Sequence, residues 1–234
     1  LMYVARETLG ENAQGVFAKG AMISRAEEQE ALNLAAEFKF DIRVLDLNIF
    51  EVENFVQNLP ERCYYCKKEI FGHFNNIKSE GNFTALLDGT NDSDSGDYRP
   101  GRRALQELGV LSPLRDVQLS KEEIRILSRL KGLPTWNKPS MACLASRIPY
   151  GDSITPDLLI KVAKAEELLG QKGLKERRVR IHQNIARIEI PLNEFPTLME
   201  IREEITKEFI KLGFDFVTLD LVGIRSGSLN PKEK

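Results

Sequence analysis

The sequence has little sulfur, little histidine and no long apolar run. Three cysteines, two histidines and one tryptophan occur among 234 residues. Three cysteines are odd in number and too few for a disulfide scaffold, so they are better candidates for metal binding or catalysis in a reducing compartment. No apolar run approaches the roughly 20 residues that a bilayer requires, and no signal-peptide pattern is visible, so we expect a cytoplasmic protein.

The chain also lacks an excess of charge of one sign. Its formal net charge is −2, which argues against a protein that coats nucleic acid or a membrane surface. The hydrophobic share of 42% suffices for one large core or two smaller ones. We therefore expect one or two domains.

Strands and helices alternate along the first part of the chain. Strands are expected at 16–23, 41–47 and 84–87, and helices at 24–38, 63–79 and 101–108. This alternation predicts βαβ units and a parallel sheet with its ligand site at the carboxyl ends of the strands. The chain opens on a helical segment without an N-cap, and we expect the first strand of this domain to precede Leu1.

The second part of the chain predicts a smaller α+β domain. Helices are expected at 120–130, 155–169 and 195–212, a β-hairpin at 177–190, and a strand at 214–221. We place the boundary near Gly151, which gives domains of residues 1–150 and 151–234.

A segment rich in aspartate and glycine follows the strand expected at 84–87. It extends from Asp88 to Arg103. Glycines let backbone N–H groups approach a ligand, aspartates suit magnesium, and arginines suit phosphate. The position after a strand favours a nucleotide site, whereas composition alone is compatible with a long solvated loop.

Cys63 and Cys66 form a Cys-x-x-Cys motif at the start of a predicted helix. The helix N-terminus and the lysines at 67 and 68 favour thiolates on one face. With Cys143 there are three candidate ligands for a [4Fe–4S] cluster whose fourth iron is open. A zinc site completed by His73 is the competing interpretation, and a redox disulfide pair is a third.

Cys143 lies in a segment, 137–151, that is bracketed by Pro139 and Pro149. Regular structure seldom persists between such prolines, so the segment predicts a rigid site loop. Arg147 can hold a carboxylate or phosphate in bidentate fashion, which together with a thiol suggests sulfur chemistry on an anionic substrate. The plainer alternative is that Cys143 is a small buried apolar residue.

The predicted hairpin carries charged residues on one face of each strand. Arg178 and Arg180 share a face, as do Arg187 and Glu189. Surface salt bridges, worth about 0–1 kcal/mol each, are the ordinary explanation.

Taken together, these motifs resemble the LarE family across essentially the whole chain. The resemblance is carried by the segments 62–68, 88–91, 97–101, 138–151, 178–180 and 219–230. It implies an α/β PP-loop ATP pyrophosphatase domain followed by a smaller α+β domain for substrate binding and homo-oligomer assembly. It also implies an ATP-dependent sulfur transferase that adenylates, with Mg²⁺, the carboxylates of pyridinium-3,5-biscarboxylic acid mononucleotide and then thiolates them with sulfide.

The resemblance implies a role for each matching residue. The catalytic and cluster-binding residues would be Cys63, Cys66 and Cys143. The substrate-binding residues would be Ser146, Arg147, Glu166, Arg178, Arg180 and Glu189. The residues for ATP and magnesium would be Lys67, Gly89, Thr90, Asn91, Asp94, Asp97 and Arg99.

Two departures from the family pattern matter. The Ser-Gly-Gly-x-Asp-Ser pyrophosphate loop should lie immediately before Leu1. The sulfur donor of the single-cysteine branch aligns with Ala142, whereas the three cysteines here look like the branch with a [4Fe–4S] cluster, which favours iron over zinc. The rival functions are a cluster-dependent tRNA thiolase, disfavoured by the net charge, and a non-enzymatic zinc-stabilised binding protein that needs His73.

Overall fold

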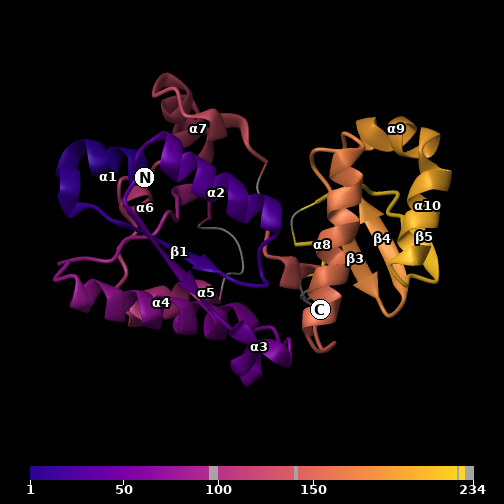
Figure 1. Cartoon of the computed structure of the whole chain (residues 1–234), viewed down its shortest axis with the longest axis horizontal. Coiled ribbons are helices and arrows are strands. Elements are labelled where there is room, and N and C mark those ends of the chain that lie inside the picture. The colour runs from indigo at the N-terminus through magenta and orange to yellow at the C-terminus, as the bar shows by residue number, and fades with distance from the viewer. Residues whose placement is uncertain (95–99, 140–141, 226, 230–234) are drawn as a thin grey trace. The chain divides into compact units, whose positions relative to one another are not determined.

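The computed structural model describes residues 1–94, 100–139, 142–225 and 227–229, which form two compact units (Figure 1). The first unit comprises Leu1–Gly20, Arg25–Phe55 and Glu61–Lys138. The second comprises Ala21–Ser24, Val56–Pro60 and Pro139–Lys234. The second compact unit therefore begins its main segment at Pro139 and includes two short segments from the N-terminal half, while the domain boundary expected near Gly151 stays a prediction. Along the described ranges, no helix is long and apolar enough to cross a membrane.

The first unit is an α/β assembly. Strands β1 (Gly15–Lys19) and β2 (Ile42–Asp46) pair in parallel, and helix α2 (Arg25–Glu37) connects them, as the alternation predicted. The remaining helices of this part of the chain are α1 (Met2–Leu9), α3 (Glu53–Val56), α4 (Arg62–Glu80), α5 (Gly101–Glu107), α6 (Pro113–Asp116) and α7 (Lys121–Leu130). Short 3-10 turns occur at η1 (Gly10–Asn12), η2 (Ile49–Glu51), η3 (Asp92–Asp94) and η4 (Pro134–Asn137).

The segment expected as a strand at 84–87 does not form one. It makes a single parallel bridge between Leu87 and Leu111, in which Asp88 N donates to Leu111 O and Leu111 N to Leu86 O, both at 2.9 Å. Pro113 begins α6 only two residues beyond Leu111, so that the partner segment turns away before a ladder can extend. The prediction of a strand there was wrong, although the two segments do lie side by side.

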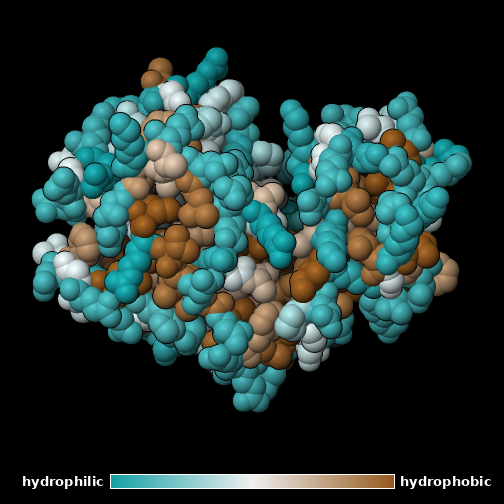
Figure 2. Space-filling view, in the orientation of Figure 1, coloured by the Kyte–Doolittle hydropathy of each residue, from teal (hydrophilic) through white to brown (hydrophobic). Residues whose placement is uncertain are grey.

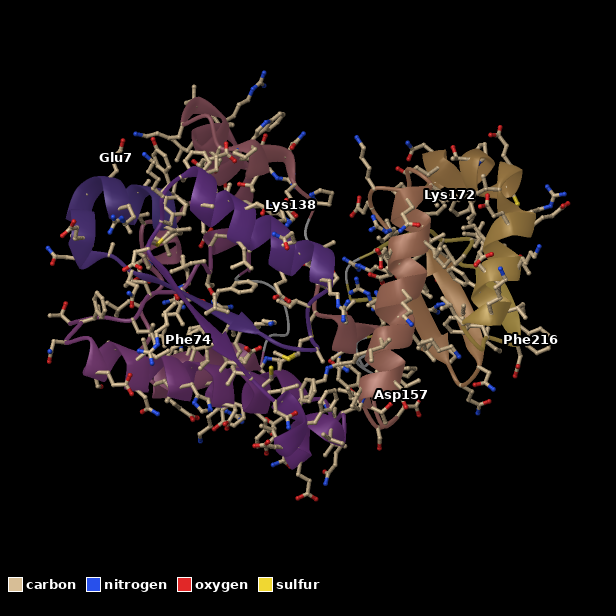
Figure 3. All side chains as sticks on the ribbon, in the orientation of Figure 1. Glu7, Phe74, Lys138, Asp157, Lys172 and Phe216 are labelled. Atoms are coloured by element: carbon tan, nitrogen blue, oxygen red, sulfur yellow. The ribbon has the colours of Figure 1, made fainter. Side chains whose placement is uncertain are left out.

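Helix α4 supplies apolar side chains to the core of the first unit. Phe74 and Ile77 are buried one turn apart, and Phe71 packs edge-on against Phe74 with ring centroids 5.2 Å apart. Figure 3 shows Phe74 on the side of α4 that faces β1. The apolar spacing of three residues is what a helix needs to face a core on one side only.

The second unit is a three-stranded sheet in the order β3–β4–β5, with helices packed on it. Strands β3 (Arg178–His182) and β4 (Ile185–Glu189) form the predicted antiparallel hairpin, and β5 (Phe216–Leu219) runs parallel to β4. Helix α8 (Pro156–Gln171) begins as predicted, because Thr155 Oγ1 accepts a hydrogen bond from Leu158 N and Pro156 occupies the first helical position. The 3-10 turns η5 (Leu144–Arg147) and η6 (Leu192–Glu194) complete the unit with helices α9 (Phe195–Glu200) and α10 (Arg202–Lys211).

The long helix expected at 195–212 is two helices. Helix α9 (Phe195–Glu200) and helix α10 (Arg202–Lys211) meet at Ile201, whose φ of −101° and ψ of 7° are not helical. Arg202 Nη1 donates to the carbonyl oxygen of Met199 at 2.9 Å and so satisfies an acceptor that the helix break exposes. The apolar pattern continues across the break, which is why the sequence predicts one helix.

Candidate functional site

Four charged side chains in the second unit are almost inaccessible to solvent. Arg147 is 1% exposed, Glu166 5%, Arg180 3% and Glu189 0%. Because the removal of an ion from water costs several kcal/mol, each of these groups needs an opposite charge close by. The interpretation of the hairpin charges as surface salt bridges is therefore wrong for Arg180 and Glu189.

Arg147 and Glu166 form a bidentate ion pair. Arg147 Nε and Nη2 lie 2.6 Å and 3.0 Å from the two carboxylate oxygens of Glu166, and Val179 N donates to Glu166 Oε1 at 2.9 Å. Nη1 of Arg147 donates to Ser146 Oγ at 2.9 Å and to the carbonyl of Ala142 at 3.1 Å. The two residues predicted to bind substrate thus satisfy one another, and they join η5, α8 and β3.

Arg180 and Glu189 form the second buried pair, across the hairpin. Arg180 Nε and Nη2 each lie 3.1 Å from Glu189 Oε2. The other carboxylate oxygen, Oε1, accepts from Arg187 Nη2 at 3.1 Å and from Ser228 Oγ at 2.7 Å. Arg180 Nη1 also donates to the carbonyl of Ser146 at 2.5 Å, so the two buried pairs meet at Ser146.

These contacts belong to one arginine cluster with an excess of positive charge. Its guanidinium groups are those of Arg147, Arg178, Arg180, Arg187 and Arg225. Its carboxylates are those of Glu166, Glu189 and Asp220. Five cations against three anions leave an excess of two positive charges, which suits an anionic ligand.

Two arginines of the cluster have lowered pKa values. Burial lowers the pKa of the Arg178 guanidinium, and the neighbouring charge of Arg147 lowers it further. Burial also lowers the pKa of Arg180 despite its contact with Glu189. Within the described part of the chain, Nε of Arg187 is buried and finds no hydrogen-bond acceptor, so one donor of the cluster is left unsatisfied.

The three cysteines are divided between the two units. Cys63 and Cys66 lie in the first two turns of α4, three residues apart and hence on one face, in the first unit. Cys143 is exposed, precedes η5 and belongs to the second unit. Among the residues that the structure describes, no three His, Cys, Asp or Glu side chains are grouped as a metal site. Convergence of the three sulfur atoms on one centre stays a prediction.

Helix α4 argues against the zinc alternative. It is continuous from Arg62 to Glu80, so Cys66 and His73 are separated by about 10.5 Å along the axis at 1.5 Å per residue. A sulfur and a nitrogen that bind one zinc ion lie at most about 4.4 Å apart. His73 Nε2 instead lies 3.1 Å from Glu69 Oε1, one turn earlier. The side chains of Cys66 and His73 would have to bridge the difference, whereas His73 is paired with Glu69 in this structure.

The aspartate-rich segment begins with an ordered turn centred on Asp88. Its carboxylate accepts hydrogen bonds from Thr90 Oγ1 and, at 2.6 Å, from Ser112 Oγ. An added Cβ at Gly89 would meet no atom within 4 Å, so there is open space beside this turn. Neither Asp88 nor Ser112 was predicted as a site residue, although the Asp-x-Thr spacing is typical of such a turn.

Of the other predicted nucleotide residues, the structure describes some and not others. Asn91 is half-buried directly before η3, and the backbone of Asp94 ends that turn. Asp97 and Arg99 lie outside the described residues. Asp92 N donates to Leu119 O at 3.0 Å, which fixes the start of η3.

Lys67 lies where α5 approaches α4. A Cβ added at Gly101 would lie 2.8 Å from Lys67 Cδ and 3.1 Å from the carbonyl oxygen of Cys63. The first residue of α5 can therefore sit against the Cys-x-x-Cys turn only because it is glycine.

A cavity of about 820 Å³ lies inside the first unit. Residues from α1, β1, α2, α4 and the segment 83–90 line it, and Figure 2 shows apolar side chains gathered between α1, α2 and α4. Its polar lining includes Lys67, Asp88 and Thr90. The structure thus brings Lys67, Gly89 and Thr90 to one cavity whose volume is in the range of small-molecule sites.

Comparison with known proteins reveals relatives that match most of the chain. No protein-family model matches it. An uncharacterized protein of Synechocystis is 38% identical over 229 residues, which are 97% of this chain and 85% of that protein. Pyridinium-3,5-bisthiocarboxylic acid mononucleotide synthase of Lactiplantibacillus plantarum is 34% identical over 231 residues, which are 98% of this chain and 84% of that protein. An uncharacterized protein of Methanocaldococcus jannaschii is 32% identical over 211 residues, 90% and 81% of the two chains.

Proposed function

Because the chain belongs to the LarE family of sulfur-transferring enzymes, we propose that it thiolates the carboxyl groups of pyridinium-3,5-biscarboxylic acid mononucleotide in the synthesis of the nickel-pincer nucleotide cofactor. The named relative makes the corresponding bisthiocarboxylic acid mononucleotide. Its small-molecule substrate, together with a net charge of −2, favours this reaction over the thiolation of tRNA.

The observation that carries the proposal is the positive excess of the arginine cluster. The substrate bears a phosphate and two carboxylates, and buried guanidinium groups recognise such groups in bidentate fashion. We assign Arg178 and Arg187 to this contact, since both are only partly buried and no acceptor among the described residues meets Arg187 Nε. Arg147, Glu166, Arg180 and Glu189 then position the cluster and Ser146 beside it.

The first chemical step is adenylation of a substrate carboxylate. A carboxylate oxygen attacks the α-phosphorus of ATP, pyrophosphate leaves, and an acyl-adenylate forms. We assign Lys67, Gly89, Thr90, Asn91 and Arg99 to the nucleotide, with Asp94 and Asp97 for Mg²⁺. The proposal is supported by the cavity that Lys67, Gly89 and Thr90 line, and by the ordered Asp88 turn between them. ATP with Mg²⁺ is the co-substrate.

The second step replaces AMP by sulfur. Hydrosulfide forms a bond to the acyl carbon, the bond to the adenylate oxygen breaks, and AMP leaves with the electron pair. We assign Cys63, Cys66 and Cys143 to a [4Fe–4S] cluster, which when bound supplies an iron without a protein ligand that can hold sulfide. All three are free thiols, and two lie in the first turns of a helix.

Anaerobic purification followed by iron and sulfide analysis tests the assignment of the cysteines. We expect close to four irons and four sulfides per chain, and near-stoichiometric zinc without iron would contradict it. An anaerobic assay with ATP, sulfide and the biscarboxylated nucleotide tests the reaction. Formation of AMP and thiocarboxylate in equal amounts is expected, and AMP release without thiocarboxylate would contradict the sulfur transfer.

We also propose that the enzyme is a cytoplasmic homo-oligomer. A reducing compartment would keep the three thiols available for metal. Phe216, the first residue of β5, is 65% exposed. Leu221 and Val222 just beyond β5 are 80% and 66% exposed, so contact with another copy would remove three large apolar side chains from water. Sedimentation analysis tests this.

A further inference from the structure

His182, the last residue of β3, borders the arginine cluster of the second unit. Because side chains alternate between the two faces of a strand, His182 lies on the same face of β3 as Arg178 and Arg180. In the hairpin Arg180 is opposite Arg187, and His182 is opposite Ile185. Arg187 is therefore the diagonal neighbour of His182 across the two strands, a separation that long side chains can span.

His182 and Arg187 each carry a buried nitrogen atom that is left unsatisfied. Nε2 of His182 and Nε of Arg187 meet no hydrogen-bond partner in the part of the chain that the structure describes. The other nitrogens of Arg187 are engaged, since Nη2 lies 3.1 Å from Glu189 Oε1 and Nη1 lies 3.7 Å from Asp220 Oδ2. Two unsatisfied nitrogens on one face indicate a place for a ligand that satisfies both. The Arg187 side chain is 25% exposed, so a ligand can approach it from solvent.

The charges around His182 keep its imidazole neutral while no ligand is bound. Burial lowers the pKa of His182, and the positive charge of Arg187 lowers it further. Arg180 acts in the same direction, whereas Asp152 of the turn before α8 and Glu189 of β4 oppose it. An anion beside Arg187 would offset the positive neighbours and so favour the protonated imidazole.

The two nitrogens then suit one oxyanion. Nε–H of Arg187 is a permanent donor, and Nε2 of His182 becomes a donor when the ring is protonated. Because binding and protonation favour each other, the anion must bind more tightly to the protonated form by the same factor by which it strengthens proton binding.

We propose that His182 is a further residue of the anion site: its imidazole takes up one proton from solvent when a phosphate group binds against Nε of Arg187. This inference rests on the proposed function, because it adds a residue and a pH dependence to the same arginine cluster. The phosphate of the mononucleotide is the group assigned here. It stays unmodified throughout the reaction, whereas each carboxylate has to reach ATP.

The titration of His182 tests this directly. Sulfate is the probe, because it is a tetrahedral dianion that does not titrate near neutral pH, as phosphate does. Nuclear magnetic resonance follows the imidazole signals, of which the chain has two, His73 and His182. We expect sulfate to raise the midpoint of the His182 titration by about 1 pH unit or more, relative to chloride at equal ionic strength. The signal of His73, which lies beside Glu69 in the first unit, should titrate alike in both salts.

A matched pair of substitutions tests the reciprocal effect on binding. His182→Gln keeps a hydrogen-bonding side chain but has no proton to take up, so its Kd for sulfate should be the same at about pH 5.5 and about pH 7.5. The wild type and His73→Gln should bind sulfate several-fold more tightly at the lower pH, approaching tenfold for each pH unit by which the midpoint rises. If His182→Gln does not fold, the wild-type titration decides alone.

An unchanged His182 midpoint in sulfate overturns the inference, and an ordered water would then be the partner of the two nitrogens. An equal pH dependence of sulfate binding in His182→Gln overturns it as well. A chain that forms thiocarboxylate while its His182 does not respond to sulfate loses this inference and keeps the proposed function. A chain whose His182 responds to sulfate but that forms no thiocarboxylate keeps the protonated anion site and loses the proposed reaction.

Discussion

Replacement of Glu189 by glutamine removes the charge on which two arginines of the cluster converge. Its carboxylate meets Arg180, Arg187 and Ser228 at 2.7–3.1 Å, and the residue is 0% exposed. Glutamine keeps the shape and one acceptor oxygen but turns its amide donors toward guanidinium groups. We therefore expect a loss near the low end of the about 3–5 kcal/mol that a broken buried ion pair costs.

Thermal unfolding measures this loss. At about 2–4 °C per kcal/mol for a chain of this size, a loss of about 3 kcal/mol lowers the melting temperature by about 6–12 °C. Glu203→Gln is the control, because Glu203 forms an exposed pair with Arg202 at 3.1 Å. Such a pair contributes little, so its melting temperature should stay within about 2 °C of the wild type.

Inorganic phosphate then separates the charge argument from a simple packing defect. Glu189→Gln raises the positive excess of the cluster from two charges to three, so an anion should bind the variant more tightly. A ligand at 100 times its Kd stabilises by about 2.7 kcal/mol. Phosphate should therefore raise the melting temperature of Glu189→Gln more than that of the wild type. Equal shifts, or a loss below 1 kcal/mol, would refute the reasoning.

Three further substitutions test other parts of the structure. In urea unfolding, Gly101→Ala should lower the free energy of unfolding by about 1–3 kcal/mol, because its Cβ would lie 3.1 Å from a backbone oxygen of α4. Gly72→Ala, whose Cβ would point into open space beside α4, is the control and should raise it by about 0.5–1 kcal/mol. Ser112→Ala should lower the free energy of unfolding by about 1.5–3 kcal/mol, because it removes the 2.6 Å hydrogen bond to Asp88. It should also raise the KM for ATP, and an unchanged KM would show that Asp88 is not part of the nucleotide site. Burial raises the pKa of Asp220, but the hydrogen bond from Val222 N–H and the charges of the neighbouring arginines outweigh it and lower this pKa below 3.8. The ionised carboxylate therefore stabilises the fold above that pH, and this contribution is lost as the pH falls. Asp220→Asn should therefore lower the melting temperature at pH 7 and reduce its decline below pH 4, and an unchanged acid profile would contradict this.

Local signals predicted most elements of the fold. The capping box at Ser120 is formed, with Ser120 Oγ and Glu123 satisfying each other's backbone N–H groups at the start of α7. The Thr155-Pro156 start of α8 and the two-residue turn of the hairpin are also confirmed. Each of these depends on residues fewer than five positions apart, which is the range over which sequence patterns carry direct structural information.

The membership of the second unit could not be predicted in this way. Leu144 N donates to Met22 O at 2.9 Å, and Asn58 contacts Pro149. These partners are about 90 to 120 residues apart, and the sequence around Met22 and Asn58 resembles ordinary connections between helices. Only the folded chain reveals that residues 21–24 and 56–60 pack with the C-terminal half.

The buried charges on the hairpin show a different limit of pattern reasoning. Alternation along β3 places Val179 and Ile181 on the apolar face and therefore assigns Arg180 to solvent. The opposite face is in fact covered, because the carbonyl of Ser146 accepts from Arg180 and Ser228 reaches Glu189 across it. Period-2 patterning identifies the two faces of a strand but does not reveal that non-regular segments cover the polar one.

The buried ion pairs also explain how an exposed thiol can have a fixed surrounding backbone. Cys143 is exposed, whereas Arg147 four residues later is 1% exposed and donates to the carbonyl of Ala142 on the other side of it. Replacement of a buried pair by apolar residues often leaves stability unchanged or higher, so the Arg147–Glu166 pair is better explained by geometry than by stability. Its planar, bidentate fork allows one orientation of the guanidinium, and that orientation sets the path of residues 142–147.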